Sequence, residues 1–246
     1  MENAYLNNRF RVYKYIYTHT DTVVISMYIA MTGSVCSGKT GVSDELVARR
    51  YNLREEIARP MIARREIEDQ NQLPWSKGYE DEFQLELLEK HLELDTILHY
   101  GNDFCFQDTT YLDPLTFLRV NQAMRYNNDL TAPYSEAEIA AREMIKKERD
   151  FRKSLGGQLP TFERVFCLER LDSYEKDPQR QFDPDYARIL HDAKKVIYTG
   201  EYGYDMIDVP IFQTTGSSVP QNEKVSRSID ARVRFILGHI PKNGIH

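Results

Sequence analysis

The chain alternates between short, unbroken apolar runs and longer segments in which apolar residues recur every three or four positions. The short runs are rich in β-branched and aromatic residues, as buried parallel strands are, whereas the spaced pattern is typical of helices with one buried face. The predicted strands are 23–30, 103–107, 164–168 and 204–210, and the predicted helices are 41–50, 62–67, 80–100, 114–126, 131–153, 185–195 and 226–237. Because strands and helices alternate, we expect an α/β fold of three layers around a mostly parallel, doubly wound sheet.

A glycine-rich turn separates the first predicted strand from the first predicted helix. Residues 33–40 match G-x-x-x-x-G-K-T, the pattern of a phosphate-binding P-loop. Glycine at both conserved places of the pattern lets the backbone approach a phosphate, and the loop amides and helix N-terminus attract its charge. We expect ATP or GTP and Mg²⁺ as cofactors, with Lys39 on the β- and γ-phosphates and the Thr40 hydroxyl on Mg²⁺. The predicted nucleotide-binding residues are Gly33, Ser34, Val35, Cys36, Ser37, Gly38, Lys39 and Thr40.

An acidic residue, Asp108, follows the second predicted strand. Ligands of open α/β sheets collect at the carboxyl ends of the strands, so an acid at this place is positioned to bind Mg²⁺ or to act on the attacking nucleophile. The alternative is that Asp108 caps the next helix, which is a common role for aspartate. We favour the functional role because the P-loop belongs to the same predicted sheet.

The predicted helix 131–153 is highly charged. Ser135 and Glu138 have the spacing of a capping box at its start. The favoured interpretation is a solvated helix whose basic end complements the helix dipole, and the alternative is a surface that meets a polyanion. The basic residues at this end are Lys146, Lys147, Arg149, Arg152 and Lys153.

Length and charge limit the organisation and the partners. The 246 residues suffice for one domain with a full core. We expect an N-terminal extension at 1–22, a P-loop domain at 23–240 that contains the charged helix 131–153 as an insertion, and a tail at 241–246. The net charge of -6 argues against a general nucleic-acid binder.

Cysteine usage and hydropathy bear on the cellular location. The three cysteines lack metal-ligand spacing, and Cys105 and Cys167 lie in or beside predicted strands, so we expect them to pack in the core, with Cys36 a small residue in the P-loop. No apolar stretch is long enough to cross a bilayer, and no signal peptide is visible at the N-terminus. We therefore expect no membrane partner and a reducing, cytoplasmic location.

Several short motifs follow the P-loop in an order that resembles one family. They are Glu56–Arg59, Leu73–Trp75, Phe106–Thr110, Asp177 with Arg180, and Gly203–Tyr204 before Asp208–Pro210. The order resembles the NadR-type AAA-like P-loop family, which includes ribosylnicotinamide kinase domains. Similar-looking bacteriophage kinases phosphorylate hydroxymethyluracil in DNA. The resemblance spans about residues 28–240 and implies an ATP-dependent kinase fold with a mobile lid.

The resemblance also implies roles for particular residues. Asp108 acts beside the acceptor hydroxyl and, with Thr40, at the metal; Glu56, Arg59 and Thr109 lie near the substrate. The implied catalytic residues are Lys39, Asp108 and Arg180, with Arg180 in the lid over the phosphates. Ribosylnicotinamide kinases tend to have a second acid where this chain has Thr110, which argues against ribosylnicotinamide as the acceptor.

The sequence therefore predicts a kinase that moves the γ-phosphate of ATP to a hydroxyl of a nucleoside-like acceptor. A more specific alternative is a kinase of hydroxymethyluracil in DNA, for which the basic end of helix 131–153 is suited. An alternative from another class is a regulatory nucleotide-binding protein that hydrolyses slowly or only changes shape. No Asn-Lys-x-Asp guanine signature is present, which weakens a GTPase form of that alternative.

Overall fold

A five-stranded parallel sheet organises the described part of the chain. The computed structural model describes residues 28–34, 37–54, 56–76, 78–94, 105–154, 159, 161–169, 184–212 and 221–240. In these residues the strand order is β2-β3-β1-β4-β5, and all pairs are parallel, as the sequence predicted. The strands are β1 (Tyr28–Gly33), β2 (Asn52–Arg54), β3 (Cys105–Asp108), β4 (Phe162–Leu168) and β5 (Met206–Val209).

Helices follow the strands in the predicted alternation. The expected extension 1–22 and tail 241–246 lie outside the described residues, so the domain limits stay a prediction. No helix in the described part has the length and apolar character needed to cross a bilayer. The helices are α2 (Lys39–Ala48), α3 (Ala58–Glu68), α4 (Glu80–Leu94), α5 (Leu112–Arg125), α6 (Glu136–Ser154), α7 (Pro184–Lys194) and α8 (Gln221–Gly238), with a 3-10 turn η1 (Gln70–Gln72) and a π-helix η2 (Lys195–Glu201).

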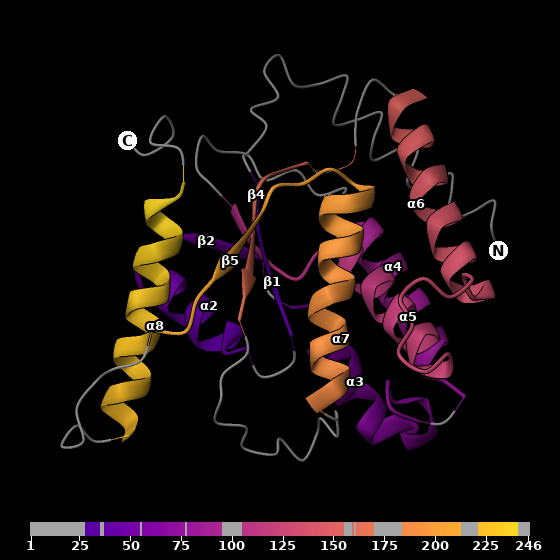
Figure 1. The fold of residues 1–246 in the computed structure, drawn as a ribbon, viewed down its shortest axis with the longest axis horizontal. Coiled ribbons are helices and arrows are strands. Elements are labelled where there is room, and N and C mark those ends of the chain that lie inside the picture. Colours follow the sequence, from indigo (N-terminus) through magenta and orange to yellow (C-terminus); the bar gives the residue numbers. More distant parts are fainter. Residues whose placement is uncertain are drawn as a thin grey trace.

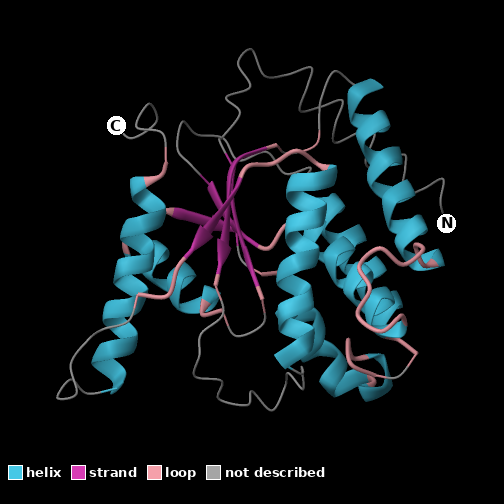
Figure 2. Cartoon of the chain, viewed as in Figure 1, coloured by secondary structure: helices cyan, strands magenta, loops and turns pink. Residues whose placement is uncertain are grey.

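The sheet separates two hydrophobic layers, which gives the expected three-layer arrangement (Figures 1 and 2). Successive side chains of a strand point to opposite faces. Ile29 and Met31 of β1 therefore pack with α2 and α8, whereas Ala30 packs with α4, α5 and α6. Cys105 and Cys167 are buried in the strands, which confirms their predicted place in the core.

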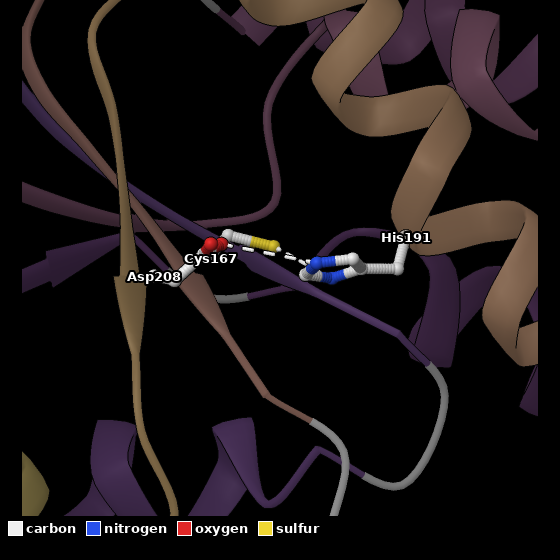
Figure 3. Close-up of side chains that lie close together, drawn as sticks. All are labelled: Cys167, His191 and Asp208. Carbon is white, nitrogen blue, oxygen red and sulfur yellow. Dashed lines mark hydrogen bonds and ion pairs between the residues drawn. The ribbon is translucent and has the colours of Figure 1, made fainter.

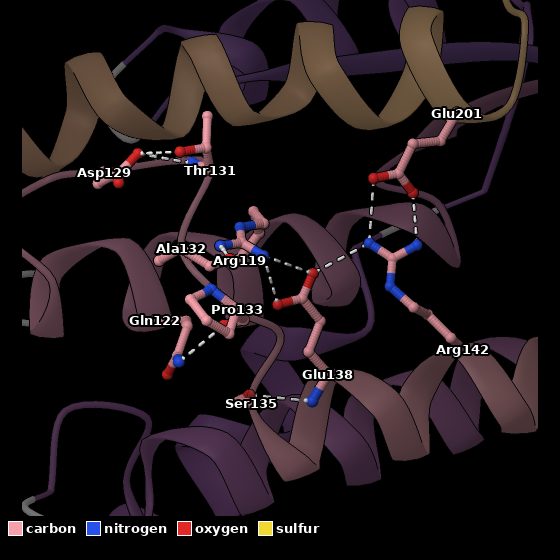
Figure 4. Close-up of polar contacts among 10 residues, drawn as sticks. All are labelled: Arg119, Gln122, Asp129, Thr131, Ala132, Pro133, Ser135, Glu138, Arg142 and Glu201. Carbon is pink, nitrogen blue, oxygen red and sulfur yellow. Dashed lines mark hydrogen bonds and ion pairs between the residues drawn. The ribbon is translucent and has the colours of Figure 1, made fainter.

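The sequence favoured a solvated helix for this charged segment, but α6 also buries charged side chains against α5 (Figure 4). The Ser135 hydroxyl accepts a hydrogen bond from the backbone N–H of Glu138 at 3.1 Å, as a capping box requires. The Glu138 carboxylate is fully buried and binds Arg119 at 3.2 Å and Arg142 at 3.0 Å. The helix thus docks through its first turns, and it begins at Glu136 rather than at 131.

The basic end of α6 is smaller than the sequence indicated. Arg152 is buried, and it donates to Glu148 at 2.8 Å and to the backbone oxygen of Leu92 at 2.9 Å. Lys146 lies 3.7 Å from Asp150 on the same helix. Burial of Arg152 removes one of the five predicted cations from any surface for a polyanion, whereas Lys146 stays 74% exposed beside Asp150.

Removing the buried Glu138 carboxylate is expected to destabilise the fold strongly. Glu138→Ala leaves the Arg119 guanidinium buried without its anion, and loss of one partner of a buried pair costs about 3–5 kcal/mol. The matched control is Glu136→Ala, an exposed acid two residues earlier, which should change stability by less than about 0.5 kcal/mol. Urea unfolding of both variants measures the difference, and equal midpoints would contradict the assigned role of Glu138.

Candidate functional site

The P-loop joins β1 to α2 in the predicted order of strand, loop and helix. Gly38 has a φ of 77°, a left-handed conformation that favours glycine. A Cβ atom at Gly33 would lie 2.6 Å from Ser37 Oγ and 3.0 Å from the Leu168 backbone oxygen, so only glycine fits there. Val35 and Cys36 lie outside the described residues.

Two P-loop hydroxyls support phosphate binding. Ser34 Oγ and Ser37 Oγ are buried, and neither has a hydrogen-bond partner among the residues that the structure describes. A buried hydroxyl without a partner costs about 1–3 kcal/mol, so an anion that accepts from it stabilises the loop. The residues of the loop therefore fit the phosphates that the sequence motif predicts.

Arg232 of α8 holds the loop from behind. Its guanidinium is buried and donates to the backbone oxygens of Ser37, Glu169 and Pro210, at 2.5, 2.9 and 3.2 Å. Burial lowers the pKa of Arg232 from its usual value, with Glu169 acting in the opposite sense. One side chain thus ties the P-loop to the ends of β4 and β5.

Asp108 binds the P-loop lysine. Asp108 Oδ1 lies 2.7 Å from Lys39 Nζ, and Oδ2 accepts from Ser43 Oγ at 2.9 Å. Burial opposes the charge of Lys39, but Asp108 and Glu56 outweigh this effect and raise the pKa of Lys39. The alternative role of Asp108 as a helix cap is wrong. The Thr110 hydroxyl, not Asp108, accepts the hydrogen bond from the backbone N–H of Leu112 in the first turn of α5.

Three other predicted site residues form a chain beside the loop. Arg59 Nη2 donates to Thr40 Oγ1 at 2.7 Å, and Arg59 Nε donates to Glu56 Oε2 at 2.9 Å. A carboxylate and a cation therefore lie next to the hydroxyl predicted to bind Mg²⁺. The oxygens of Thr40 and Asp108 are the hard ligands that Mg²⁺ prefers, so these residues fit the ion.

A cavity opens directly beside the P-loop. Of the residues predicted for the site, Gly33, Ser34, Lys39, Glu56 and Thr109 line it. The other lining residues come mainly from α3, α4, α5 and the loop before α4, and three of them are aromatic. They are Ala58, Ile62, Pro74, Trp75, Phe83, Gln84, Leu87, His91, Asp113, Phe117 and Lys194.

Two polar side chains of α4 face this cavity without the partners that burial demands. Gln84 and His91 are 6% and 3% exposed. Gln84 Oε1 and His91 Nε2 have no hydrogen-bond partner within the described ranges. A ligand that donates to Gln84 Oε1, or that forms a hydrogen bond with His91 Nε2, would recover the free energy of their desolvation. The cavity thus combines aromatic side chains with buried polar atoms that lack a hydrogen-bond partner among the described residues.

A buried ion pair lies at one end of the cavity. Lys194 is the last residue of α7. It binds Asp113 Oδ1 and also donates to Thr32 Oγ1. Asp113 Oδ2 accepts from the backbone N–H of Thr110 at 2.7 Å. Burial by itself would raise the pKa of Asp113, but Lys194 and Thr32 outweigh it and lower the pKa.

The turn after β3 is strained where it meets the cavity. Thr109 has a φ of 84°, which is rare for a β-branched residue, and its N–H donates to the backbone oxygen of Met31 at 3.2 Å. Such strain is typical of functional sites. Thr110 is fully buried and bonds to Tyr198, so this position supports the fold and does not line the cavity.

The structure thus gathers Lys39, Thr40, Glu56, Arg59 and Asp108, whereas Arg180 lies outside the described residues. Sequence reasoning missed the two unpaired polar residues of α4. The available signal was polar side chains on the apolar stripe of the predicted helix 80–100. Asp113 and Lys194 carried no such signal, because they are far apart in the sequence.

A family model described as an AAA domain matches residues 28–216. The chain belongs to this family. The resemblance inferred from the order of motifs is therefore confirmed at the level of the family. No curated protein matches the chain in sequence.

Solved structures of two kinds share the fold. Deoxyadenosine kinase from M. mycoides, with products dCMP and dCDP bound, is 17% identical with a TM-score of 0.50, over 86% of this chain and 97% of that one. A NadR protein in complex with NR is 16% identical with a TM-score of 0.51, over 90% of this chain and 54% of that one. At such identities the similarity shows a shared P-loop kinase fold.

His91 is expected to make the stability of this AAA-domain protein depend on pH. Burial, aided by Arg54 and opposed by Asp113, lowers the pKa of His91 from 6.5 to about 4. Between these values the unfolded chain binds a proton that the folded chain excludes, so stability is complete above pH 6.5 and falls as the pH approaches 4. The loss amounts to about 3 kcal/mol.

The measurement is the free energy of unfolding in urea across this pH range. His91→Gln, which cannot take up the proton, should flatten the dependence, whereas His239→Gln, at an exposed histidine, should not. The same slope in the wild type and in His91→Gln would show that His91 is not the group responsible.

Proposed function

We propose that this protein is a P-loop phosphotransferase that moves the γ-phosphate of ATP to a hydroxyl of a nucleoside-like acceptor. The observation that carries the proposal is the cavity beside Lys39, because it joins a phosphate-binding loop to a space with aromatic walls. Trp75, Phe83 and Phe117 offer flat apolar surfaces on which a base can stack. Gln84 and His91 add unpaired polar atoms for its edges or its sugar.

The residues around Lys39 suit phosphoryl transfer, which needs positioning and charge stabilisation more than covalent help. Lys39 supplies positive charge at the end of the cavity where the phosphates would lie. Asp108 positions Lys39 through a 2.7 Å ion pair. Bound Mg²⁺, held by Thr40 and Asp108, would neutralise charge on the phosphates.

Glu56 is the better placed proton acceptor for the acceptor hydroxyl. Its side chain lines the cavity, whereas Asp108 does not, and both Asp108 oxygens accept hydrogen bonds from the P-loop and α2. Arg59 orients Glu56 at 2.9 Å. We therefore move the role of acceptor base from Asp108 to Glu56 and keep Asp108 for Mg²⁺ and for its contact with Lys39. The lid role of Arg180 stays a prediction.

The nature of the relatives favours a small acceptor over DNA. The two solved structures carry dCMP and dCDP or NR, which are not polymers. The basic end of α6, on which the DNA hypothesis rested, has one cation fewer on its surface because Arg152 is buried. A free nucleoside or a closely similar small molecule is therefore the acceptor class that we propose.

Release of ADP in the presence of different acceptors tests the proposed function. We expect release from ATP and Mg²⁺ to be fast only when a nucleoside-like acceptor is added, because the acceptor completes the site. The tubes contain ATP and Mg²⁺ alone, with a panel of free nucleosides including ribosylnicotinamide, or with plain or hydroxymethylated DNA. Lys39→Ala should abolish release, and Lys90→Ala, at an exposed lysine of α4, should not.

The alternatives give distinct outcomes in the same experiment. Equal, slow ADP release in every tube would replace the kinase with a regulatory hydrolase. Fast ADP release with hydroxymethylated DNA, with free nucleosides inactive, would replace the small acceptor with the polymer.

A second prediction concerns recognition of the acceptor by Gln84. Gln84→Leu removes the amide whose oxygen is unpaired and replaces it with an apolar side chain of similar size, so the KM for the acceptor should rise about tenfold or more with the KM for ATP unchanged. The matched control is Gln122→Leu, because the amide of Gln122 donates to the backbone oxygen of Pro133 at 2.9 Å, away from the cavity. An unchanged KM for the acceptor in Gln84→Leu would remove Gln84 from the acceptor site.

A further inference from the structure

Three potential metal ligands meet where β4, β5 and α7 pack together. They are Cys167 of β4, His191 of α7 and Asp208 of β5 (Figure 3). One ligand atom from each lies within 4.8 Å of the others. Cys167 Sγ is 3.5 Å from His191 Nδ1, and Asp208 Oδ1 is 3.8 Å from His191 Nε2. Because they are distant in the sequence, the spacing rules for metal motifs did not reveal them.

This cluster is separate from the nucleotide site. Cys167 pairs in register with Asp208 on one side and with Thr32 on the other, so the cluster is level with the last residues of β1. None of its three residues lines the cavity beside the P-loop. A ligand bound here would therefore not compete with a nucleotide or an acceptor.

Ordinary hydrogen bonding leaves the cluster incomplete. Asp208 Oδ1 is buried and has no hydrogen-bond partner among the residues described, and 3.8 Å to His191 Nε2 is too long for one. Lys195 binds the other oxygen, Oδ2, at 2.8 Å, from a side chain that is 47% exposed. A buried carboxylate oxygen without a donor is costly, and here it points into a group of a thiol and an imidazole.

We propose that Cys167, His191 and Asp208 bind a divalent transition-metal ion, with zinc the ion that the ligands favour. Sulfur, imidazole nitrogen and carboxylate oxygen together suit Zn²⁺, whereas Mg²⁺ and Ca²⁺ prefer oxygen alone. Zinc–ligand bonds of about 2.0–2.3 Å place tetrahedral ligand atoms about 3.5 Å apart. Cys167 Sγ and His191 Nδ1 already have this separation, whereas the Asp208 carboxylate, whose 3.8 Å contact is to the other ring nitrogen, has to move closer to bind the same ion. His191 and Asp208 are partly exposed, which leaves the fourth position to water.

Metal binding removes the proton of the Cys167 thiol. Cys167 is fully buried, so its sulfur carries its proton when no cation is present. As the sulfur–zinc bond forms, the S–H bond breaks and the proton passes to the buffer. The bound cation and the two anionic ligands then neutralise one another, since Cys167 and Asp208 each contribute one negative charge.

The site joins the sheet to α7. That helix also carries Lys194, which binds Asp113 and Thr32 beneath the P-loop. A metal that binds the folded chain and not the unfolded one shifts the unfolding equilibrium by mass action. The protein should therefore unfold at a higher temperature with Zn²⁺ than without it.

Cobalt provides a spectroscopic test of the site. The full chain is stripped with a chelator and titrated with Co²⁺, and we expect one equivalent to give the thiolate-to-cobalt charge-transfer band and the intense visible bands of a tetrahedral ion. Zn²⁺ should displace the cobalt, and Mg²⁺ should not. The expected rise in melting temperature with Zn²⁺ is measured on the same protein.

Variants assign the signal to these residues. His191→Gln and Asp208→Asn, both at partly exposed side chains that can be changed without opening the core, should weaken binding at least about tenfold. Cys167→Ser should remove the charge-transfer band, whereas Cys105→Ser, at a buried cysteine of β3, should keep it. Circular dichroism and melting without metal verify that each variant is folded.

The proposal fails on two results. One is a cobalt spectrum of the folded wild type without a thiolate band. The other is unchanged cobalt affinity in folded His191→Gln and Asp208→Asn. Neither result depends on whether the protein is a kinase.

Discussion

The buried ion pair between Lys194 and Asp113 is the contact on which the arrangement of the site depends. Through Lys194 it joins α7 to the end of β1, and through Asp113 it fixes the turn after β3. Breaking one partner of such a pair costs about 3–5 kcal/mol, because the other charge stays buried. The carboxyl ends of β1 and β3, which carry the P-loop and Asp108, are therefore held in one position by residues that come from two helices.

On the opposite face of the sheet, a second polar contact holds the P-loop. Arg232 of α8 binds the backbone oxygen of Ser37 and those of Glu169 and Pro210, so the P-loop is tied to the ends of β4 and β5. The two polar contacts differ in kind, since Arg232 binds neutral carbonyls and Lys194 binds a carboxylate. Together they fix the backbone from which phosphate-binding amides project, and this preorganisation is what transition-state stabilisation by charge requires.

The sequence predicted the parts of the site that depend on local pattern. An apolar run before G-x-x-x-x-G-K-T was enough for β1, the P-loop and α2, and the position of Asp108 after the next run was also right. The short strand β2 was missed because Asn52–Arg54 is only partly buried and lacks an apolar run. The π-helix η2 continues α7 without any break that a helical pattern could show.

The acceptor side could not be read from the sequence for a physical reason. Gln84 and His91 stand out only once α4 is known to face a cavity, because a polar residue on an apolar stripe has several explanations. The pairing of Asp113 with Lys194, and of Glu138 with Arg119, depends on contacts between separate elements. Charge complementarity of this kind has no signature in spacing, since any acid can pair with any base that the fold brings near.

The cations of the site are already bound to carboxylates in the structure, and this determines how a nucleotide would bind. Lys39 contacts Asp108, and Arg59 contacts Glu56 as well as the hydroxyl of Thr40. A phosphate that binds Lys39 therefore exchanges one anionic partner for another, which avoids the large cost of desolvating a lone charge. The exchange at Lys39 would release Asp108, whose oxygens could then bind Mg²⁺ in the proposed phosphotransferase, whereas Glu56 stays paired with Arg59.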